Sequence, residues 1–127
     1  MEKKRDIEER TIQYSLRIIN LYRVLESDNV GRIIGKQVLR SRTSIGANVH
    51  EAQGGQSRAD FIAKMSIAYK EARETHYWLR LIREADLVTA ARIAELYLET
   101  EELIKIIGTI LVNTKRQPRK NSDDHEE

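Results

Sequence analysis

The residues best suited to catalysis or metal binding in this chain are its three histidines, because it contains no cysteine. A carboxylate-bridged di-metal site in a helical bundle requires a glutamate three residues before a histidine. The positions three residues before His50, His76 and His125 hold Ala47, Arg73 and Ser122. His50 and His76 are therefore interpreted as solvated helix surface, and no Ser/His/Asp arrangement can be assembled. We expect no catalytic residue, metal or cofactor, and hence no enzyme.

A basic segment is the more informative feature. No acidic residue occurs between Asp28 and Glu51, whereas Arg32, Lys36, Arg40 and Arg42 are all basic. The first three are spaced by four residues, so they share one face of a helix. This face is predicted to point outward and to bind nucleic acid through phosphate contacts. An ordinary solvated face is the alternative, although such faces usually mix charges of both signs.

Two further faces suggest association between copies of the chain. Glycines inside a helix cost stability relative to alanine, so they indicate close approach of another backbone. The first face contains Gly35, Leu39, Gly46 and Val49, and the second contains Ile67, Trp78 and Leu81. Both are predicted to form an oligomer interface, although Trp78 could instead cover the edge of its own core.

Polar residues are expected to flank the core between the second and third helices. Polar groups near a core must be hydrogen-bonded to avoid destabilising it. We predict a structural polar layer that fixes the register of the two helices and, as the less favoured alternative, a ligand pocket. The residues of this layer are Gln37, Ser44, Asn48, Glu51, Glu71 and Glu74.

Apolar residues recur at helical spacing throughout the chain and predict four helices, over residues 5–26, 30–53, 57–85 and 89–114. Ser27-Asp28-Asn29, Ser57 and Thr89 are expected to cap helix starts, and Gly54-Gly55 to end the second helix. Short turns between long helices favour an all-α, antiparallel up-down-up-down four-helix bundle over residues 1–115. Residues 116–127 lack apolar side chains and are expected to form a disordered polar tail.

The composition limits the remaining possibilities. The chain has 127 residues, a length that fits one domain. Its net charge is +2. No apolar run is long enough to span a bilayer, and residues 1–6 lack the apolar core of a signal peptide. We therefore expect a cytoplasmic protein without a membrane or small-molecule partner.

Several motif blocks resemble a known bacterial family. They are Arg40-Ser41, Ser44 to Ala52, Asp60-Phe61-Ile62, Lys70-Glu71-Ala72, Glu74-Thr75 and Tyr77-Trp78-Leu79. Over about residues 5 to 114 the chain resembles the four-helix bundle proteins encoded in intervening sequences of 23S ribosomal RNA genes.

This resemblance implies a homopentameric ring, similar to the accessory variability proteins of diversity-generating retroelements, whose basic surface engages RNA and a reverse transcriptase. The leading hypothesis is a non-enzymatic, ring-forming bundle that binds structured RNA or a ribonucleoprotein. The alternative is a protein-interaction adaptor or scaffold without nucleic-acid binding.

Overall fold

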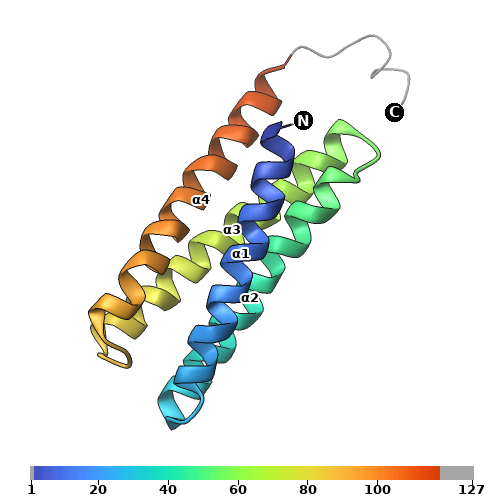
Figure 1. Cartoon of the computed structure of the whole chain (residues 1–127). Coiled ribbons are helices and arrows are strands. Elements are labelled where there is room, and N and C mark those ends of the chain that lie inside the picture. The colour runs from blue at the N-terminus through green and yellow to red at the C-terminus, as the bar shows by residue number, and fades with distance from the viewer. Residues whose placement is uncertain (1, 118–127) are drawn as a thin grey trace.

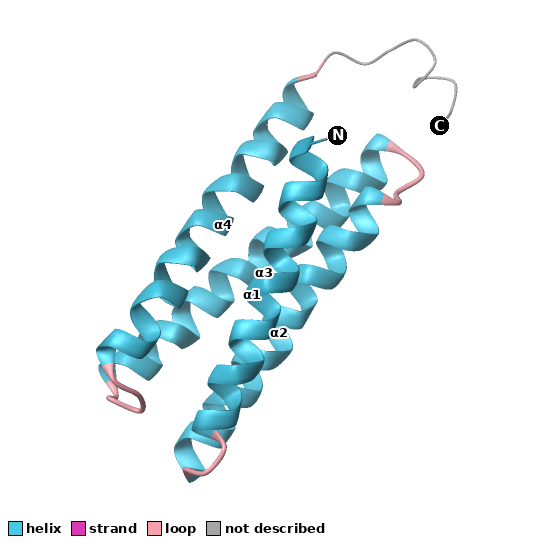
Figure 2. Ribbon diagram, in the orientation of Figure 1, coloured by secondary structure: helices cyan, strands magenta, loops and turns pink. Residues whose placement is uncertain are grey.

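The computed structural model describes residues 2–117 and contains four helices joined by short turns (Figure 1). They are α1 (Glu2–Leu25), α2 (Asn29–Gln53), α3 (Arg58–Glu84) and α4 (Ala90–Arg116). Consecutive helices run in opposite directions, and the described residues contain no strand (Figure 2). The predicted all-α four-helix bundle is confirmed, and each helix end lies within three residues of its expected position. Arg116, expected in the tail, ends α4, while residues 118–127 of the predicted tail lie outside the described part.

Local hydrogen bonds explain where the helices begin. The side chains of Asp28, Ser57 and Thr89 each accept a hydrogen bond from a backbone amide three residues later, which satisfies an otherwise free donor of the first turn. Helix α2 ends at Gln53 and is followed by Gly54, as predicted, but with φ −96° this glycine is not in the left-handed conformation. Positive φ occurs instead at Asp86 (φ 55°), a residue type that tolerates this conformation, in the turn between α3 and α4.

The core follows the apolar spacing of three helices closely. In α1 the residues at this spacing are all buried: Ile7, Thr11, Tyr14, Ile18, Leu21 and Leu25. In α3 and α4 the corresponding series run from Phe61 to Ile82 and from Ile93 to Thr114, and only the terminal members, Phe61 and Thr114, are half-buried. These helices therefore bury the faces that their periodicity indicates.

Helix α2 buries a wider face than predicted. Its buried residues include Gly31, Gly35, Arg42 and Val49, whereas Ile34, which the apolar spacing also places toward the core, is half-buried. The reason is that α1 lies against this side of α2. A Cβ atom added at Gly35 would lie 3.0 Å from Cδ1 of Tyr22 in α1. The close contact predicted from the glycines therefore occurs within the chain, with side chains of α1.

Buried hydroxyl pairs connect the helices across the core. Tyr14 Oη lies 2.5 Å from Thr100 Oγ1, which links α1 to α4, and Ser41 Oγ lies 2.8 Å from Thr75 Oγ1, which links α2 to α3. Helices α1 and α4 approach each other least closely of the neighbouring pairs. The bidentate ion pair between Arg10 and Glu99 adds a second connection between them.

Candidate nucleic-acid interface

The α2 basic row, defined as Arg32, Lys36 and Arg40, lies on the exposed side of the helix. Arg32 Nη1 donates a hydrogen bond to Asn29 Oδ1 at 3.2 Å, so its charge is not neutralised by that contact. Lys36 forms no ion pair with any residue in the part of the chain that the structure describes. Two cations of the row are thus available to an external anion.

Arg40 differs because carboxylates of α3 surround its guanidinium. Arg40 Nη2 donates to Glu74 Oε2 at 2.5 Å, and Arg40 Nη1 lies 3.7 Å from Glu71 Oε1. The absence of acidic residues from α2 before Glu51 therefore does not leave all of its cations unpaired. The Arg40 side chain remains 53% exposed, so it can still contact a ligand while its charge is partly compensated.

The predicted role of Arg42 in nucleic-acid binding is wrong. Arg42 is fully buried, because it lies on the side of α2 that packs against α1. Its Nη1 donates to Ser15 Oγ at 2.6 Å, and the guanidinium lies 5.7 Å from the centroid of the Tyr14 ring. Nε and Nη2 have no hydrogen-bond partner among the described residues. Arg42 is a buried cation of the core.

Burial shifts the pKa values of Arg42 and Tyr14 but does not change their protonation near neutral pH. Desolvation lowers the pKa of Arg42 to about 10, and the nearby Tyr14 opposes this change. Burial also raises the pKa of the Tyr14 phenol above its usual value. At neutral pH the guanidinium is therefore charged and the phenol is protonated.

The predicted polar layer is made of several separate contacts. Asn48 Nδ2 donates to Ser44 within α2. Across the helices, Glu51 pairs with Lys64 at 3.2 Å, and Glu71 and Glu74 lie against Arg40. Gln37 is half-buried on the same flank of α2. The fully buried link between α2 and α3 is the Ser41–Thr75 pair instead.

Part of the predicted oligomer interface is covered by other helices of the same chain. Gly35 and Val49 are buried within the single chain, so their assignment to a subunit interface is wrong. Gly46 is half-buried beside Ser15, and Leu39 packs at the edge of the core. On α3, Ile67 is 43% exposed, while Trp78 and Leu81 are half-buried.

A second exposed basic row lies on α3 and was missed in the sequence. We define the α3 basic row as Lys70, Arg73 and Arg80, and exposed Tyr77 lies between the last two. The residues share one face because they are spaced by three or four. In the sequence Glu71 and Glu74 alternate with Lys70 and Arg73, so this segment does not look basic. Glu71 and Glu74 in fact lie on the flank facing α2, so the outward face is more basic than the sequence suggests.

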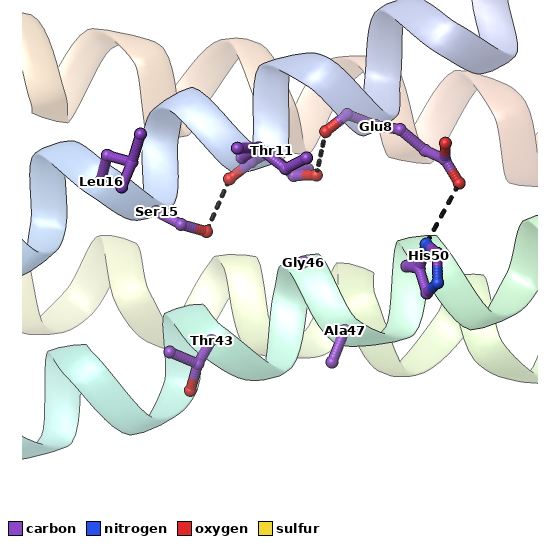
Figure 3. Close-up of a pocket in the computed structure, with 9 residues that line it drawn as sticks. Glu8, Thr11, Ser15, Leu16, Thr43, Gly46, Ala47 and His50 are labelled. Atoms are coloured by element: carbon purple, nitrogen blue, oxygen red, sulfur yellow. Dashed lines mark hydrogen bonds and ion pairs between the residues drawn. The ribbon is translucent and has the colours of Figure 1, made fainter.

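A shallow groove lies between α1 and α2 (Figure 3). Its volume is about 280 Å³, and its sides carry Ile12 and Leu16 from α1 and Thr43 and Ala47 from α2. At one end, His50 Nδ1 lies 3.6 Å from Glu8 Oε2. The hydroxyls of Thr11, Ser15 and Thr43 donate to backbone carbonyls of their own helices. The groove thus offers mainly apolar contact to a partner.

Among residues 7–117, whose side chains the structure describes, no cluster of three or more histidine or acidic side chains could hold a metal ion. Within the same range, none of the helices has the length and apolar character needed to cross a membrane.

The sequence and fold match one family. The sequence model of the 23S rRNA-intervening sequence proteins matches residues 3–109. A crystal structure of a protein of unknown function from the S23 ribosomal protein family of Bacteroides thetaiotaomicron is similar, with 39% identity and a TM-score of 0.81. The match covers 87% of this chain and 98% of that one. No curated protein matches the chain. The chain therefore belongs to the 23S rRNA-intervening sequence protein family.

Proposed function

We propose that this protein is a non-enzymatic, cytoplasmic bundle that assembles into a ring and binds structured RNA or a ribonucleoprotein. The observation that supports RNA binding is the exposed α2 basic row on a helix without acidic residues between Asp28 and Glu51. Cations on such a face bind phosphates and release condensed counterions, so affinity falls as salt rises. The pentameric ring and the relation to retroelement accessory proteins rest on the family resemblance.

Charge reversal tests the RNA proposal. The triple variant Arg32→Glu/Lys36→Glu/Arg40→Glu is compared with Arg92→Glu/Lys105→Glu/Lys115→Glu, which reverses three exposed cations of α4. The net charge changes equally in both variants, and Arg40→Glu also removes the ion pairs with Glu71 and Glu74, so circular dichroism confirms that both variants are folded. Binding of a labelled RNA hairpin is measured by fluorescence anisotropy over a range of salt concentrations.

The α2 variant is expected to bind more weakly, and its plot of log affinity against log salt should become less steep by about one for each lost phosphate contact. The α4 variant should stay close to the parent. Full RNA affinity of the α2 variant at low salt, or equal losses in both variants, would refute binding through this face.

A protein-interaction adaptor is the second candidate, and the apolar groove between α1 and α2 favours it. Ile12 is 54% exposed and Leu16 is 50% exposed beside this groove, so both can pack against a partner. Purification from the native host separates the two functions. RNA binding predicts nuclease-sensitive nucleic acid in the purified material, whereas the adaptor function predicts a stoichiometric protein that Ile12→Ser/Leu16→Ser releases.

A further inference from the structure

Tyr77 is unusual among the aromatic residues of this chain. It is 56% exposed, whereas every other tyrosine, the phenylalanine and the tryptophan in the described residues are buried or half-buried. Large aromatic side chains normally bury most of their surface in a core or an interface. An exposed tyrosine on a regular helix therefore suggests a binding contact.

The Tyr77 ring contacts Trp78, which is itself held by a hydrogen bond to Glu74. It meets the Trp78 ring edge-on, with centroids 5.3 Å apart and an interplanar angle of 71°. Trp78 Nε1 donates to Glu74 Oε2 at 3.1 Å, and the same oxygen accepts from Arg40 of α2. These contacts orient Trp78, so the neighbouring Tyr77 ring loses less conformational freedom when a ligand binds.

Cations surround Tyr77 on its own helix. Arg73 and Arg80 lie one turn to either side, and both are exposed. Arg80 Nε is 3.6 Å from Glu84 Oε2, a partner that is itself exposed. Lys70 and Arg73 form no ion pair with a described residue. The outward face of α3 is therefore a basic row with an aromatic ring within it.

The α2 basic row extends this surface. The contacts Arg40–Glu74 and Ser41–Thr75 fix the antiparallel register of α2 and α3. One turn further along, Lys36 is level with Trp78 to Arg80, because antiparallel helices advance equally in opposite directions. The two basic rows thus lie on neighbouring helices, and Tyr77 lies at a level between Lys36 and Arg40.

We propose that this composite surface binds unpaired nucleotides of an RNA, with a base stacked on Tyr77 and the adjacent phosphates held by the two basic rows. A duplex offers phosphates but keeps the faces of its bases covered, so an exposed aromatic ring adds affinity only for loops, bulges or single strands. This inference rests on the proposed function and specifies the form of RNA that the surface recognises.

The test compares Tyr77→Ala with Tyr77→Phe, which keeps the ring and is the matched control. Affinity is measured for a single-stranded RNA, for a hairpin with an unpaired loop and for a blunt duplex of the same length. Stacking predicts that Tyr77→Ala weakens single-strand and loop binding by roughly 10- to 100-fold, leaves duplex binding unchanged, and is rescued in Tyr77→Phe.

Trp78 provides an independent signal because the chain contains a single tryptophan. A base stacked on Tyr77 should change the Trp78 emission on addition of single-stranded RNA, and the change should be absent in Tyr77→Ala. Circular dichroism checks that Tyr77→Ala is folded, as expected for an exposed position.

The possible failures of the two proposals can be told apart. If Tyr77→Ala binds all three RNAs like the parent while the α2 charge reversal abolishes binding, the stacking inference is wrong and the RNA function stands. If the parent binds none of the RNAs, the proposed function itself fails. If Tyr77→Ala instead lowers the mass of the assembly or releases a bound protein, the Tyr77 side chain is part of a protein–protein contact and base stacking is refuted.

Discussion

At the scale of single residues, Arg42 is the least expected feature of the molecule. A buried guanidinium loses its hydration, and here one hydroxyl and one aromatic face replace it, with no hydrogen-bonded carboxylate in the described residues. Buried charges often stabilise a protein less than an apolar side chain of similar volume would. Arg42 is therefore expected to reduce stability.

Substitution of Arg42 tests this interpretation. Arg42→Met should increase the free energy of unfolding by about 1 to 3 kcal/mol in urea denaturation at neutral pH. Lys36→Met, on the exposed face of the same helix, should change it by less than about 0.5 kcal/mol. A loss of stability in Arg42→Met would show that the buried cation contributes favourably.

The pH dependence of the same comparison follows from the lowered pKa. Below about pH 10 Arg42 carries its proton in both folded and unfolded chains, so the cost of burying the charge is fully present. As the pH rises through this value the folded state releases the proton first, and the cost falls. The advantage of Arg42→Met should therefore be constant near neutral pH and decrease above pH 10, as measured in urea titrations at several pH values.

At the scale of helices, replacing two glycines of α2 by alanine is expected to change the stability of the fold in opposite directions. A Cβ atom at Gly31 would lie 2.6 Å from the carbonyl oxygen of Leu25, which belongs to the backbone and cannot move freely. At Gly46 the nearest atom, Ser15 Oγ, is 3.4 Å away, which is ordinary contact. Gly46→Ala should therefore gain up to about 1 kcal/mol of stability from helix propensity, and Gly31→Ala should lose stability. Thermal unfolding of both variants checks this, and a stabilised Gly31→Ala would contradict it.

The hydroxyl pair between α2 and α3 is expected to couple these helices. Ser41 Oγ and Thr75 Oγ1 each also contact a carbonyl of their own helix, so neither is left unsatisfied when the other is removed. In a double-mutant cycle of Ser41→Ala and Thr75→Val, we expect a coupling energy of about 0.5 to 1 kcal/mol. Strictly additive effects would show that the pair does not stabilise the register.

At the scale of the whole molecule, the predicted ring depends on an exposed side of α3. Ile67 is exposed in the single chain and is predicted to be covered in the assembly. Ile67→Glu should therefore dissociate the assembly, because the glutamate would bury a charge in the contact between subunits. Leu98→Glu on α4, at a still more exposed position, is the control and should leave the assembly unchanged. Sedimentation would report the mass, and a parent protein that sediments as a 14.8 kDa monomer would rule out the ring.

Periodicity and capping residues made the architecture predictable from the sequence. The α1 series from Ile7 to Leu25 is buried throughout, and Ser57 and Thr89 cap helices as expected. Both signals are local, because helical spacing fixes which side chains share a face and a cap acts within one turn. The same reasoning located the exposed positions of Arg32 and Lys36.

The sequence by itself thus determined the four helices and most of the faces that they bury. The tertiary structure decided which neighbour covers each face. Arg40 meets glutamates of α3, Arg42 is covered by α1, and the basic row around Tyr77 becomes apparent once Glu71 and Glu74 are turned toward α2. The physical reason is that periodicity gives the direction of a side chain around its own helix axis. Its charge compensation and burial depend on side chains from helices that only folding brings alongside.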